Sequence, residues 1–412
     1  MAEFDAIIIG AGIAGLTCAD QLCRRGLNLL VLEAGAEAGG RIATDRHDGF
    51  LLDRGFQVFL TAYPEAQRVL DYAKLQLQRF EPGALVWRGG AFTRLSDPWR
   101  RPRHLLATAR SPAGTLLDKL RIAKFRRDVL ADDHGLLQER PETTTIEMLR
   151  RRGFSSAIIE RFFRPFLGGV FLDHELQTSS RLCEFVFRMF SSGAAALPAG
   201  GMQAIPQQLA DRLPDGVLRL NSSVKAVHQG RVELASGEQL SALRIVLATE
   251  APAAAKLAGQ PLTGGANRVA CLYFAADEPP CAEPILMLNG DERGPVNNVC
   301  VPSQVAPTYA PAGQTLISVT ALRWTTAEAL ASDARHQLRS WFGRSVDAWR
   351  HLRTYSIEYA LPRQTPPAPA GVSPRIAAGV YRCGDYCDTA SINGAMASGR
   401  RAAEAVIEDL ER

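Results

Sequence analysis

The sequence lacks long hydrophobic runs. Over its 412 residues, no apolar stretch approaches the roughly 20 residues that a membrane-spanning helix needs. The first expected strand begins at Phe4, which leaves no room for a signal peptide before it. We therefore expect a cytoplasmic protein, and leave open a peripheral position on the cytoplasmic membrane.

Lysine is also scarce, and cysteine is dispersed. Five of the 47 basic residues are lysines and the net charge is only +4, so the arginine bias is poor evidence for nucleic acid binding. Of the eight cysteines, only Cys383 and Cys387 are close together, at a spacing that matches no strong zinc pattern. We expect free thiols in a reducing compartment, no metal site and no nucleic acid partner.

The remaining composition is typical of a globular enzyme. Hydrophobic residues make up 46% and charged residues 22% of the chain. Because 412 residues are more than one hydrophobic core usually serves, we expect two closely packed domains.

The first 33 residues predict a βαβ unit. Residues 4–9 (FDAIII) form an apolar, β-branched run that suits a buried parallel strand. Residues 13–25 have helical spacing, and residues 28–33 (NLLVLE) predict a second strand.

The rest of the chain alternates between helical and strand patterns. From about Phe80 to Ala196 the pattern is mostly helical, and residues 218–249 predict a strand, a hairpin and a strand. Further strands are expected at 267–275, 314–322 and 353–362, a helix near 326–342, and a short strand and a final helix after a Pro-rich connector at 365–374.

The sequence GAGIAG (10–15) lies between the first strand and the first helix. Gly10 permits the tight turn, Gly12 lets the backbone approach a pyrophosphate, and Gly15 lets helix and strand pack closely. Glu33 lies at the end of the next strand, where its carboxylate can accept hydrogen bonds from both ribose hydroxyls of an adenosine. The pattern predicts a dinucleotide-binding domain of the Rossmann type.

Gly39-Gly40-Arg41 follow the acid, and a guanidinium there can clamp a pyrophosphate with a planar fork of donors. The stretch GAGIAGLTCADQLCRRGLNLLVLEAGAEAGGRIAT resembles the N-terminus of the FAD-dependent superfamily of flavin amine oxidases, phytoene desaturases and protoporphyrinogen oxidases. The resemblance implies that the cofactor is FAD.

The C-terminal stretch GDYCDTASINGA (384–395) resembles the second cofactor motif of that superfamily. The resemblance implies that the acid of Gly384-Asp385 binds the ribityl or pyrophosphate region, and that a helix begins under the flavin ring. The positive end of that helix dipole would stabilise negative charge on the reduced flavin.

The segment LLDRGFQVF (51–59) resembles the one that passes the flavin ring, with Asp53 structural. The NSSVKAV and VLAT stretches resemble the strand that reads the adenine edge and the turn that closes on the cofactor. Together these resemblances imply the cofactor-binding residues Gly10, Gly12, Ile13, Ala14, Gly15, Glu33, Ala34, Gly40, Arg41, Gly55, Phe56, Val224, Ala248, Thr249, Gly384, Asp385, Ser391, Ile392, Asn393 and Ala395.

The fold implied is α/β, with a discontinuous Rossmann-type FAD domain and an inserted α+β substrate domain that combines a mixed sheet with a helical cap. We expect the FAD domain to comprise residues 1–80, 197–265 and 370–412. The substrate domain would comprise residues 81–196 and 266–369.

The resemblance implies an FAD-dependent oxidoreductase that removes hydride from an apolar small molecule, desaturase-like or protoporphyrinogen-oxidase-like, with oxygen or a quinone as the electron acceptor. FLGGVFLDHELQTSS (166–180) resembles the porphyrinogen oxidase and desaturase branch. Two alternatives stay open: an amine oxidase that releases hydrogen peroxide, and a flavoprotein with a non-redox isomerase role.

Amine oxidases usually place a lysine near the flavin, on the strand that here reads NRVACLYF, and Ala270 occupies the expected position. Tyr359 and Tyr386 are the candidate residues of the substrate cavity, and no catalytic acid or base can be nominated. In the amine oxidases a flavin-linking cysteine lies upstream of the Gly-Asp/Glu motif, so Cys387 is not expected to form such a link and we predict noncovalent FAD.

Residues 94–127 hold ten basic residues against the two acids Asp97 and Asp118, with leucines and aromatics between them. This mixture suits a helix on an anionic membrane, which would be a peripheral contact for a lipophilic substrate. A solvated, Arg-rich helical cap explains the same pattern, and we favour that interpretation.

Overall fold

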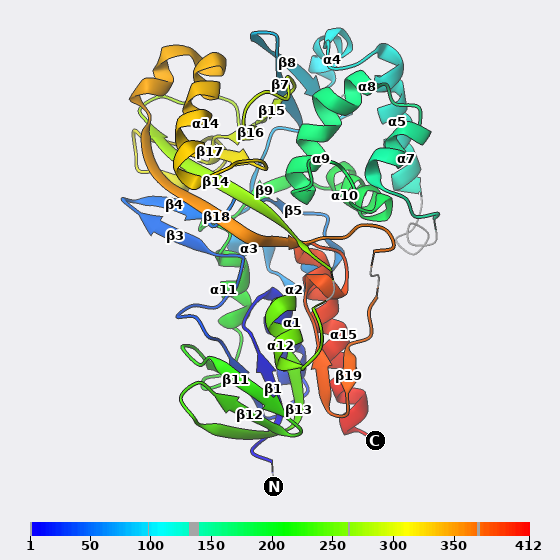
Figure 1. Ribbon diagram of the computed structural model, residues 1–412, viewed down its shortest axis with the longest axis vertical. Coiled ribbons are helices and arrows are strands. Elements are labelled where there is room, and N and C mark those ends of the chain that lie inside the picture. The colour runs from blue at the N-terminus through cyan, green and yellow to red at the C-terminus, as the bar shows by residue number, and fades with distance from the viewer. Residues whose placement is uncertain (1, 98, 132–139, 263, 369–370) are drawn as a thin grey trace.

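Two β-sheets organise the protein at opposite ends of its long axis, as Figure 1 shows. The computed structural model describes residues 2–97, 99–131, 140–262, 264–368 and 371–412. Within these residues no helix has both the length and the apolar character needed to cross a membrane.

The first sheet is a parallel sheet extended by an antiparallel hairpin. Its central strand β1 pairs on both sides, with Ile8 beside Val31 and Val246, and all three positions are buried in one hydrophobic cluster. The parallel strands run in the order β10 (Leu218–Arg219), β2 (Leu29–Leu32), β1 (Phe4–Ile9), β13 (Gln239–Leu247) and β20 (Val380–Arg382), with β11 (Val224–His228), β12 (Arg231–Leu234) and β19 (Arg375–Ala377) antiparallel at the margins.

Two helices from opposite ends of the sequence pack side by side against this sheet. These are α1 (Ile13–Cys23) and α15 (Ile392–Leu410), drawn in blue and red in Figure 1. A Cβ added at Gly399 would lie less than 3.0 Å from the carbonyl oxygen of Ala14, so only glycine permits this helix separation. The short helices α2 (Pro64–Val69), α3 (Tyr72–Leu75), α11 (Ala204–Ala210) and α12 (Ala251–Leu257) complete this half.

The second sheet is mixed, and α14 (Ala327–Phe342) covers one of its faces. Leu330, Ala334 and Leu338 of α14 pack with Leu272 and Phe274 of the sheet in one buried cluster. The strand order is β18 (Arg350–Pro362), β14 (Ala266–Ala276), β17 (Thr315–Ala321), β16 (Val296–Cys300), β15 (Leu286–Asn289), β7 (Gly83–Arg88) and β8 (Ala91–Ser96), with α13 (Pro302–Val305) after β16.

The β7–β8 hairpin corrects the prediction of a mostly helical segment after Phe80. Gly89 and Gly90 both have positive φ, so they form the two-residue turn that right-twisted strands require. A second hairpin, β3 (Thr44–His47) with β4 (Phe50–Asp53), turns at Asp48 and Gly49 in the same way. A small three-stranded sheet contains β5 (Phe59–Leu60), β9 (Ala195–Leu197) and β6 (Gln78–Arg79).

The described residues from 102 to 192 are mostly helical, as predicted, and form a cap beside the second sheet (Figure 1). Phe125 and Phe187 stack with ring centroids 4.4 Å apart and join two of its helices. The helices are α4 (Leu105–Arg110), α5 (Leu116–Ala131), α7 (Thr145–Arg151), α8 (Ser156–Ile158), a π-helical turn (Ile159–Phe163), α9 (Arg164–Phe171) and α10 (Ser180–Ser192).

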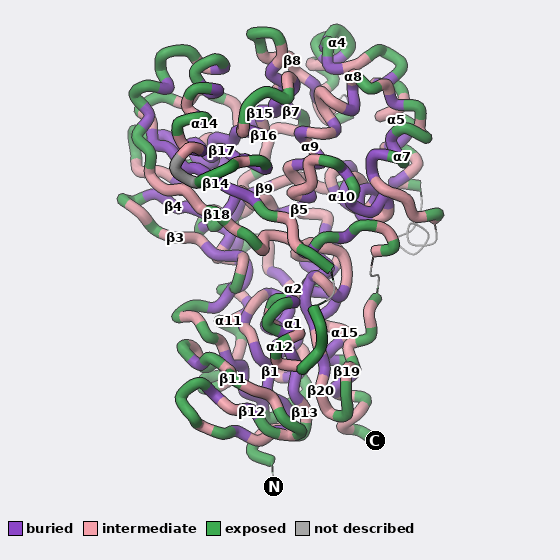
Figure 2. Tube along the Cα trace, in the orientation of Figure 1, coloured by how far each residue is buried: buried purple, intermediate pink, exposed green. Residues whose placement is uncertain are grey.

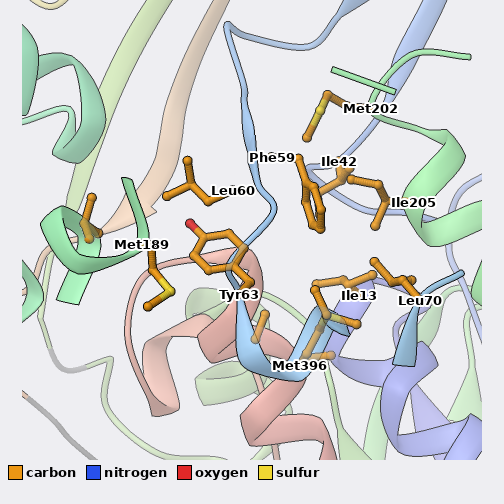
Figure 3. Packing of buried hydrophobic residues seen from close by; sticks show 14 of the residues in the cluster. Ile13, Ile42, Phe59, Leu60, Tyr63, Leu70, Met189, Met202, Ile205 and Met396 are labelled. Atoms are coloured by element: carbon orange, nitrogen blue, oxygen red, sulfur yellow. The ribbon is translucent and has the colours of Figure 1, made fainter. Parts of the chain in front are cut away.

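The buried core runs continuously from the first sheet into the cap (Figure 2). Figure 3 shows Ile13 of α1 and Met396 of α15 in the same cluster as Tyr63 and as Met189 of the cap. The strands of the two sheets come from the parts of the sequence assigned above to the two domains, but the division into domains stays a prediction. Its boundary between residues 369 and 370 lies outside the described residues.

Candidate functional site

A cavity of about 1090 Å³ lies between the two sheets. One end is lined by the loops that follow the carboxyl ends of β1, β2, β13 and β20, where ligands of open α/β sheets bind. Strands β14 and β18 line the middle, and α4, α5, α9 and α10 line the other end. The sequence motifs and the helical cap therefore face one space.

The glycines of the first loop have three different roles. Gly10 has φ +106°, and a Cβ there would come within 3.0 Å of the carbonyl oxygen of Ala248. A Cβ at Gly15 would come even closer to the carbonyl oxygen of Gly10. At Gly12 an added Cβ would meet nothing within 4 Å, because this backbone faces the open cavity. The backbone at Gly12 thus leaves room for a pyrophosphate to approach it closely.

Glu33 follows β2 and lines the cavity. Its Oε2 accepts a hydrogen bond from the Ala11 amide at 2.8 Å, and its Oε1 accepts one from the Gly35 amide at 2.8 Å. Each carboxylate oxygen retains a second lone pair, so the side chain is oriented and still able to accept from ribose hydroxyls.

Arg41 connects three separate parts of the chain. Its Nη2 donates to Asp385 Oδ1 at 2.6 Å, and its Nη1 donates to the carbonyl oxygen of Ala360 in β18 at 2.9 Å. Glu250 is a looser partner, at 3.7 Å from Nε. The sequence predicts Arg41 and Asp385 as separate cofactor ligands. Their ion pair could not be predicted, because no motif around either residue indicates that the two meet.

Gly384 and Asp385 follow β20 directly. Gly384 has φ +154°, and its amide donates to Ser398 Oγ in α15 at 2.9 Å. A Cβ at Gly384 would collide with the ring of Tyr386. The loop is therefore tied to the helix that it precedes, and both line the cavity.

The N-terminus of α15 faces the cavity through Ser391, Ile392 and Ala395. Ser391 caps the helix, because its Oγ accepts from the Gly394 amide at 3.0 Å. Asn393 points elsewhere, and its Oδ1 accepts from the Glu65 amide at 3.0 Å in the interior. Two helix N-termini, those of α1 and α15, thus meet the same cavity, and both favour negative charge.

Four of the predicted cofactor residues do not line this cavity: Gly15, Ala34, Val224 and Asn393. Gly15 serves helix packing, Ala34 is exposed, and Val224 packs at the start of β11. The others do line it: Gly10, Gly12, Ile13, Ala14, Glu33, Gly40, Arg41, Gly55, Phe56, Ala248, Thr249, Gly384, Asp385, Ser391, Ile392 and Ala395. Their contacts with a cofactor stay predictions.

Neither Tyr359 nor Tyr386 is among the residues that line this cavity, so their contact with a substrate stays a prediction. Tyr359 lies beside Arg41, with the guanidinium 5.8 Å from its ring centroid. Burial raises the pKa of Tyr386 well above its usual value, and its hydroxyl has no hydrogen-bond partner among the described residues. The tyrosines of the cavity are Tyr63 and Tyr355, which the sequence analysis missed because strand register and helix packing decide which rings face inward.

Ala270 also points away from the cavity. It is fully buried in the cluster under α14, while its neighbour Val269 lines the cavity. Strand side chains alternate, so a shift of one position exchanges the two faces. Neither position carries a lysine.

Asp53 lies buried beside the cavity wall and has a structural role, as expected. Its carboxylate accepts from the Thr44 hydroxyl at 2.5 Å, the Met202 amide at 2.9 Å and the Tyr309 hydroxyl at 2.8 Å. Burial nevertheless raises the pKa of Asp53 to about 6.

The far end of the cavity is an apolar chamber with a few charged groups. Phe162, Phe166, Phe187 and Phe190 line it, together with leucines of α4 and α5. The charged lining residues at this end are Glu81, Asp97, Arg100, Lys119 and Arg126.

The cysteines contribute no metal site. All eight are free thiols, and burial raises the pKa of Cys387 to about 12. Within the described part of the chain, no group of three or more His, Cys, Asp or Glu side chains is placed to hold a metal ion.

Comparison with known proteins agrees with this geometry. A sequence model of the family described as "Flavin containing amine oxidoreductase" matches residues 13–407. A coproporphyrinogen III oxidase of Propionibacterium freudenreichii subsp. freudenreichii is 29% identical over 171 residues, which are 40% of this chain and 31% of that protein. A chloroplastic protoporphyrinogen oxidase of Nicotiana tabacum is 31% identical over 178 residues, 41% of this chain and 29% of that protein.

Each alignment thus spans less than a third of the relative. The crystal structure of a putative protoporphyrinogen oxidase from Exiguobacterium sp. 255-15 superimposes with a TM-score of 0.75 at 20% identity, and covers 100% of both chains. That likeness establishes the fold over the whole chain.

Proposed function

Since the chain belongs to the family of flavin-containing amine oxidoreductases and uses FAD, we propose that it dehydrogenates a largely apolar small molecule. The observation that carries this proposal is the continuity of the cavity, which joins the dinucleotide motifs to a chamber lined by phenylalanine and leucine. The porphyrinogen oxidases among its relatives support a substrate of comparable size and hydrophobicity.

The residues present fit FAD. The open backbone at Gly12 and the Arg41 guanidinium would hold the phosphates, Glu33 would hold the ribose, and the α15 N-terminus would lie at the ring. When bound, FAD supplies the acceptor for a hydride from the substrate. The chain itself orients the substrate, excludes water with its apolar wall, and stabilises negative charge at the capped end of α15.

Oxygen or a quinone would serve as the electron acceptor. We propose that the FAD is noncovalent, because Cys387 is buried and is not among the residues that line the cavity. Acid precipitation should release the yellow colour into the supernatant, and colour that stays in the pellet would contradict this.

The decisive experiment is a visible spectrum of the purified protein followed by anaerobic titration with a porphyrinogen, a polyene and a set of amines. We expect flavin bands that bleach with an apolar substrate. Bleaching by amines alone, with hydrogen peroxide after aeration, would favour an amine oxidase. Flavin bands that no substrate bleaches would favour the non-redox isomerase role, and a colourless protein that FAD does not reconstitute would refute the cofactor assignment.

The chain offers one observation against the amine alternative. Lysine is absent from β14, and Lys119, the lysine in the cavity wall, donates to the carbonyl oxygens of Ala109 at 2.7 Å and Ser111 at 2.8 Å. Those two hydrogen bonds hold the Lys119 ammonium at the end of α4, so it is not placed to act at the flavin.

We also propose a peripheral membrane contact at the cytoplasmic face, made by residues 94–127. Leu106 is 68% exposed and Leu117 is 52% exposed, among basic residues. Trp99, Leu105, Leu116 and Leu120 are exposed as well and also line the cavity, so a lipophilic substrate could enter there directly.

Flotation with anionic and neutral vesicles tests this contact. We expect binding to anionic vesicles that Leu106→Ser with Leu117→Ser reduces, while Leu243→Ser, at a 48% exposed position outside the segment, has no effect. Equal recovery of wild type with and without vesicles would contradict the proposal.

A further inference from the structure

Two arginines lie together in the wall of the apolar chamber. Arg100 follows β8, and Arg126 lies on α5, and both side chains are about a quarter exposed. Burying a guanidinium group in an apolar chamber is unfavourable unless an opposite charge or hydrogen-bond acceptors lie beside it. Their partners therefore decide what the pair can do.

The protein provides the pair with one carbonyl oxygen and one carboxylate. Both arginines donate to the carbonyl oxygen of Ser191 in the last turn of α10, from Arg100 at 3.0 Å and from Arg126 at 3.4 Å. Both also lie near Asp97 Oδ2, at 3.6 Å and 3.9 Å, beyond hydrogen-bond geometry. Two positive charges against one negative charge leave the group at +1.

The arrangement leaves donors unused. The Nε of Arg126 is buried and has no hydrogen-bond partner among the described residues. Trp99 covers the Arg126 guanidinium, 4.9 Å from the ring centroid, and the Trp99 amide already donates to Asp97 Oδ1 at 3.0 Å. Each arginine carries five N–H donors, so the pair has several to offer a ligand.

The neighbouring charges do not neutralise the pair. Burial lowers the pKa of Arg100, Asp97 raises it, and the positive charges of Arg126 and Arg79 lower it further. Glu81, the next acid in the cavity wall, is held by Arg101 through two hydrogen bonds of 2.6 and 2.9 Å. A bound anion would reduce the repulsion between these positive charges.

We infer that Arg100 and Arg126 bind the carboxylate of a largely apolar substrate, whose hydrophobic body fills the phenylalanine-lined chamber toward the flavin. This inference rests on the proposed function of the cavity. A single carboxylate would neutralise the positive charge that the two arginines hold in excess of Asp97. Planar guanidinium groups bind carboxylates through paired N–H donors, which fixes the orientation of the substrate as well as its affinity.

A binding assay on the FAD-loaded protein tests the inference without turnover. The probe is a dansylated undecanoic acid, whose fluorescence rises in an apolar site, compared with its methyl ester. We expect the acid to bind at least about tenfold more tightly, since hydrogen bonds between guanidinium and carboxylate groups are charge-assisted. Arg100→Gln with Arg126→Gln should abolish the preference while leaving the affinity for the ester unchanged.

The matched control is Arg127→Gln, an exposed arginine that follows Arg126 on the same helix and does not line the cavity. It removes the same charge and should retain the preference for the acid. If the double variant loses its flavin bands, the two single variants carry the test, each with a partial loss of the preference. Equal binding of acid and ester, no binding of the acid, or a preference that survives in the variants would overturn the inference.

Displacement of the probe by dodecanoate and by dodecyl phosphate distinguishes the anions, and stronger displacement by the phosphate would overturn the carboxylate assignment. Failure of the proposed function has a different signature. A flavin that no substrate bleaches, with the acid preference intact and dependent on both arginines, would refute the oxidoreductase and support the anion site.

Discussion

At the scale of single residues, a substitution at Gly12 should affect cofactor binding without affecting the stability of the fold. Its φ of −71° suits any residue, and a Cβ there would meet no protein atom within 4 Å. Gly12→Ala should therefore change the free energy of unfolding of the FAD-free protein by less than about 0.5 kcal/mol. The same methyl group would occupy the space of the pyrophosphate and weaken FAD binding about tenfold or more, if the overlap costs about 1–3 kcal/mol.

The ratio of flavin to protein absorbance after purification measures this effect, and titration of the FAD-free protein gives the dissociation constant. Gly200→Ala is the control, because a Cβ there makes an ordinary contact of 3.5 Å with Ala204 and lies outside the cavity wall. A Gly12→Ala protein with full flavin content would refute the phosphate position.

Asp53 predicts a pH dependence of stability. Its folded pKa of about 6 exceeds the value of 3.8 that applies when the chain is unfolded. Between these values the folded protein binds the extra proton, so this group's contribution to stability is full below about pH 4 and is lost as the pH rises through 6. The shift of about two pKa units corresponds to about 3 kcal/mol.

The measurement is the difference in free energy of unfolding between wild type and Asp53→Asn at pH 4 and pH 7. Asparagine does not titrate, so the free energy of unfolding of the variant relative to wild type should be lower at pH 4 than at pH 7, by about 2 kcal/mol. Asp215→Asn, at an exposed position, should show no such change. A difference for Asp53→Asn that is constant with pH would contradict a buried, protonated carboxyl.

Residues in local motifs could be predicted from the sequence, and residues that meet across the fold could not. The Gly10–Gly15 loop and Glu33 share one βαβ unit, so their spacing determines their geometry. Arg41 and Asp385 are 344 positions apart, and their 2.6 Å ion pair depends on how α15 returns to the first sheet. The same holds for Tyr63 and Tyr355, whose orientation depends on packing rather than on composition.

At the scale of secondary structure elements, the contact between α1 and α15 positions both helix N-termini at the cavity. Gly399 permits this contact, because an added Cβ would overlap the carbonyl oxygen of Ala14. Gly399→Ala should lower the free energy of unfolding by about 1–3 kcal/mol, the usual cost of overpacking, and should weaken FAD retention as α15 moves.

Chemical denaturation and flavin content measure the two effects together. Glu404→Ala lies on an exposed face of the same helix and should change stability by less than about 0.5 kcal/mol with full flavin. Wild-type stability in the Gly399→Ala variant would show that the two helices do not hold each other in place.

The hairpins show what the sequence analysis overlooked at this scale. The pairs Asp48-Gly49 and Gly89-Gly90 are strong two-residue turn signals that predict both hairpins, and the interpretation of the region after Phe80 as mostly helical left the second one out. Long elements with a clear period, such as β14 and α14, were predicted close to their observed bounds. Short strands such as β5 and β6 exist only through pairing with β9, which no local pattern encodes.

At the scale of the whole molecule, the cofactor site joins the two ends of the chain. Its wall combines the loop after β1, the Arg41 segment and the α15 N-terminus, and the core cluster beneath it extends into the cap. A ligand that contacts all of these binds only the folded state, so it must stabilise the whole molecule. At a free FAD concentration one hundred times its dissociation constant, the stabilisation is about 2.7 kcal/mol.

We therefore expect FAD to raise the melting temperature of the FAD-free protein in a single shifted transition, seen alike by circular dichroism and by tryptophan fluorescence, to which the buried Trp87, Trp341 and Trp349 contribute. These tryptophans are buried with the second sheet, far along the sequence from the glycine loop, so they report whether stabilisation reaches that sheet. Gly12→Ala should show a much smaller rise at the same FAD concentration. Two transitions, of which FAD moves only one, would show that the cavity joins two independently folding parts rather than one cooperative unit.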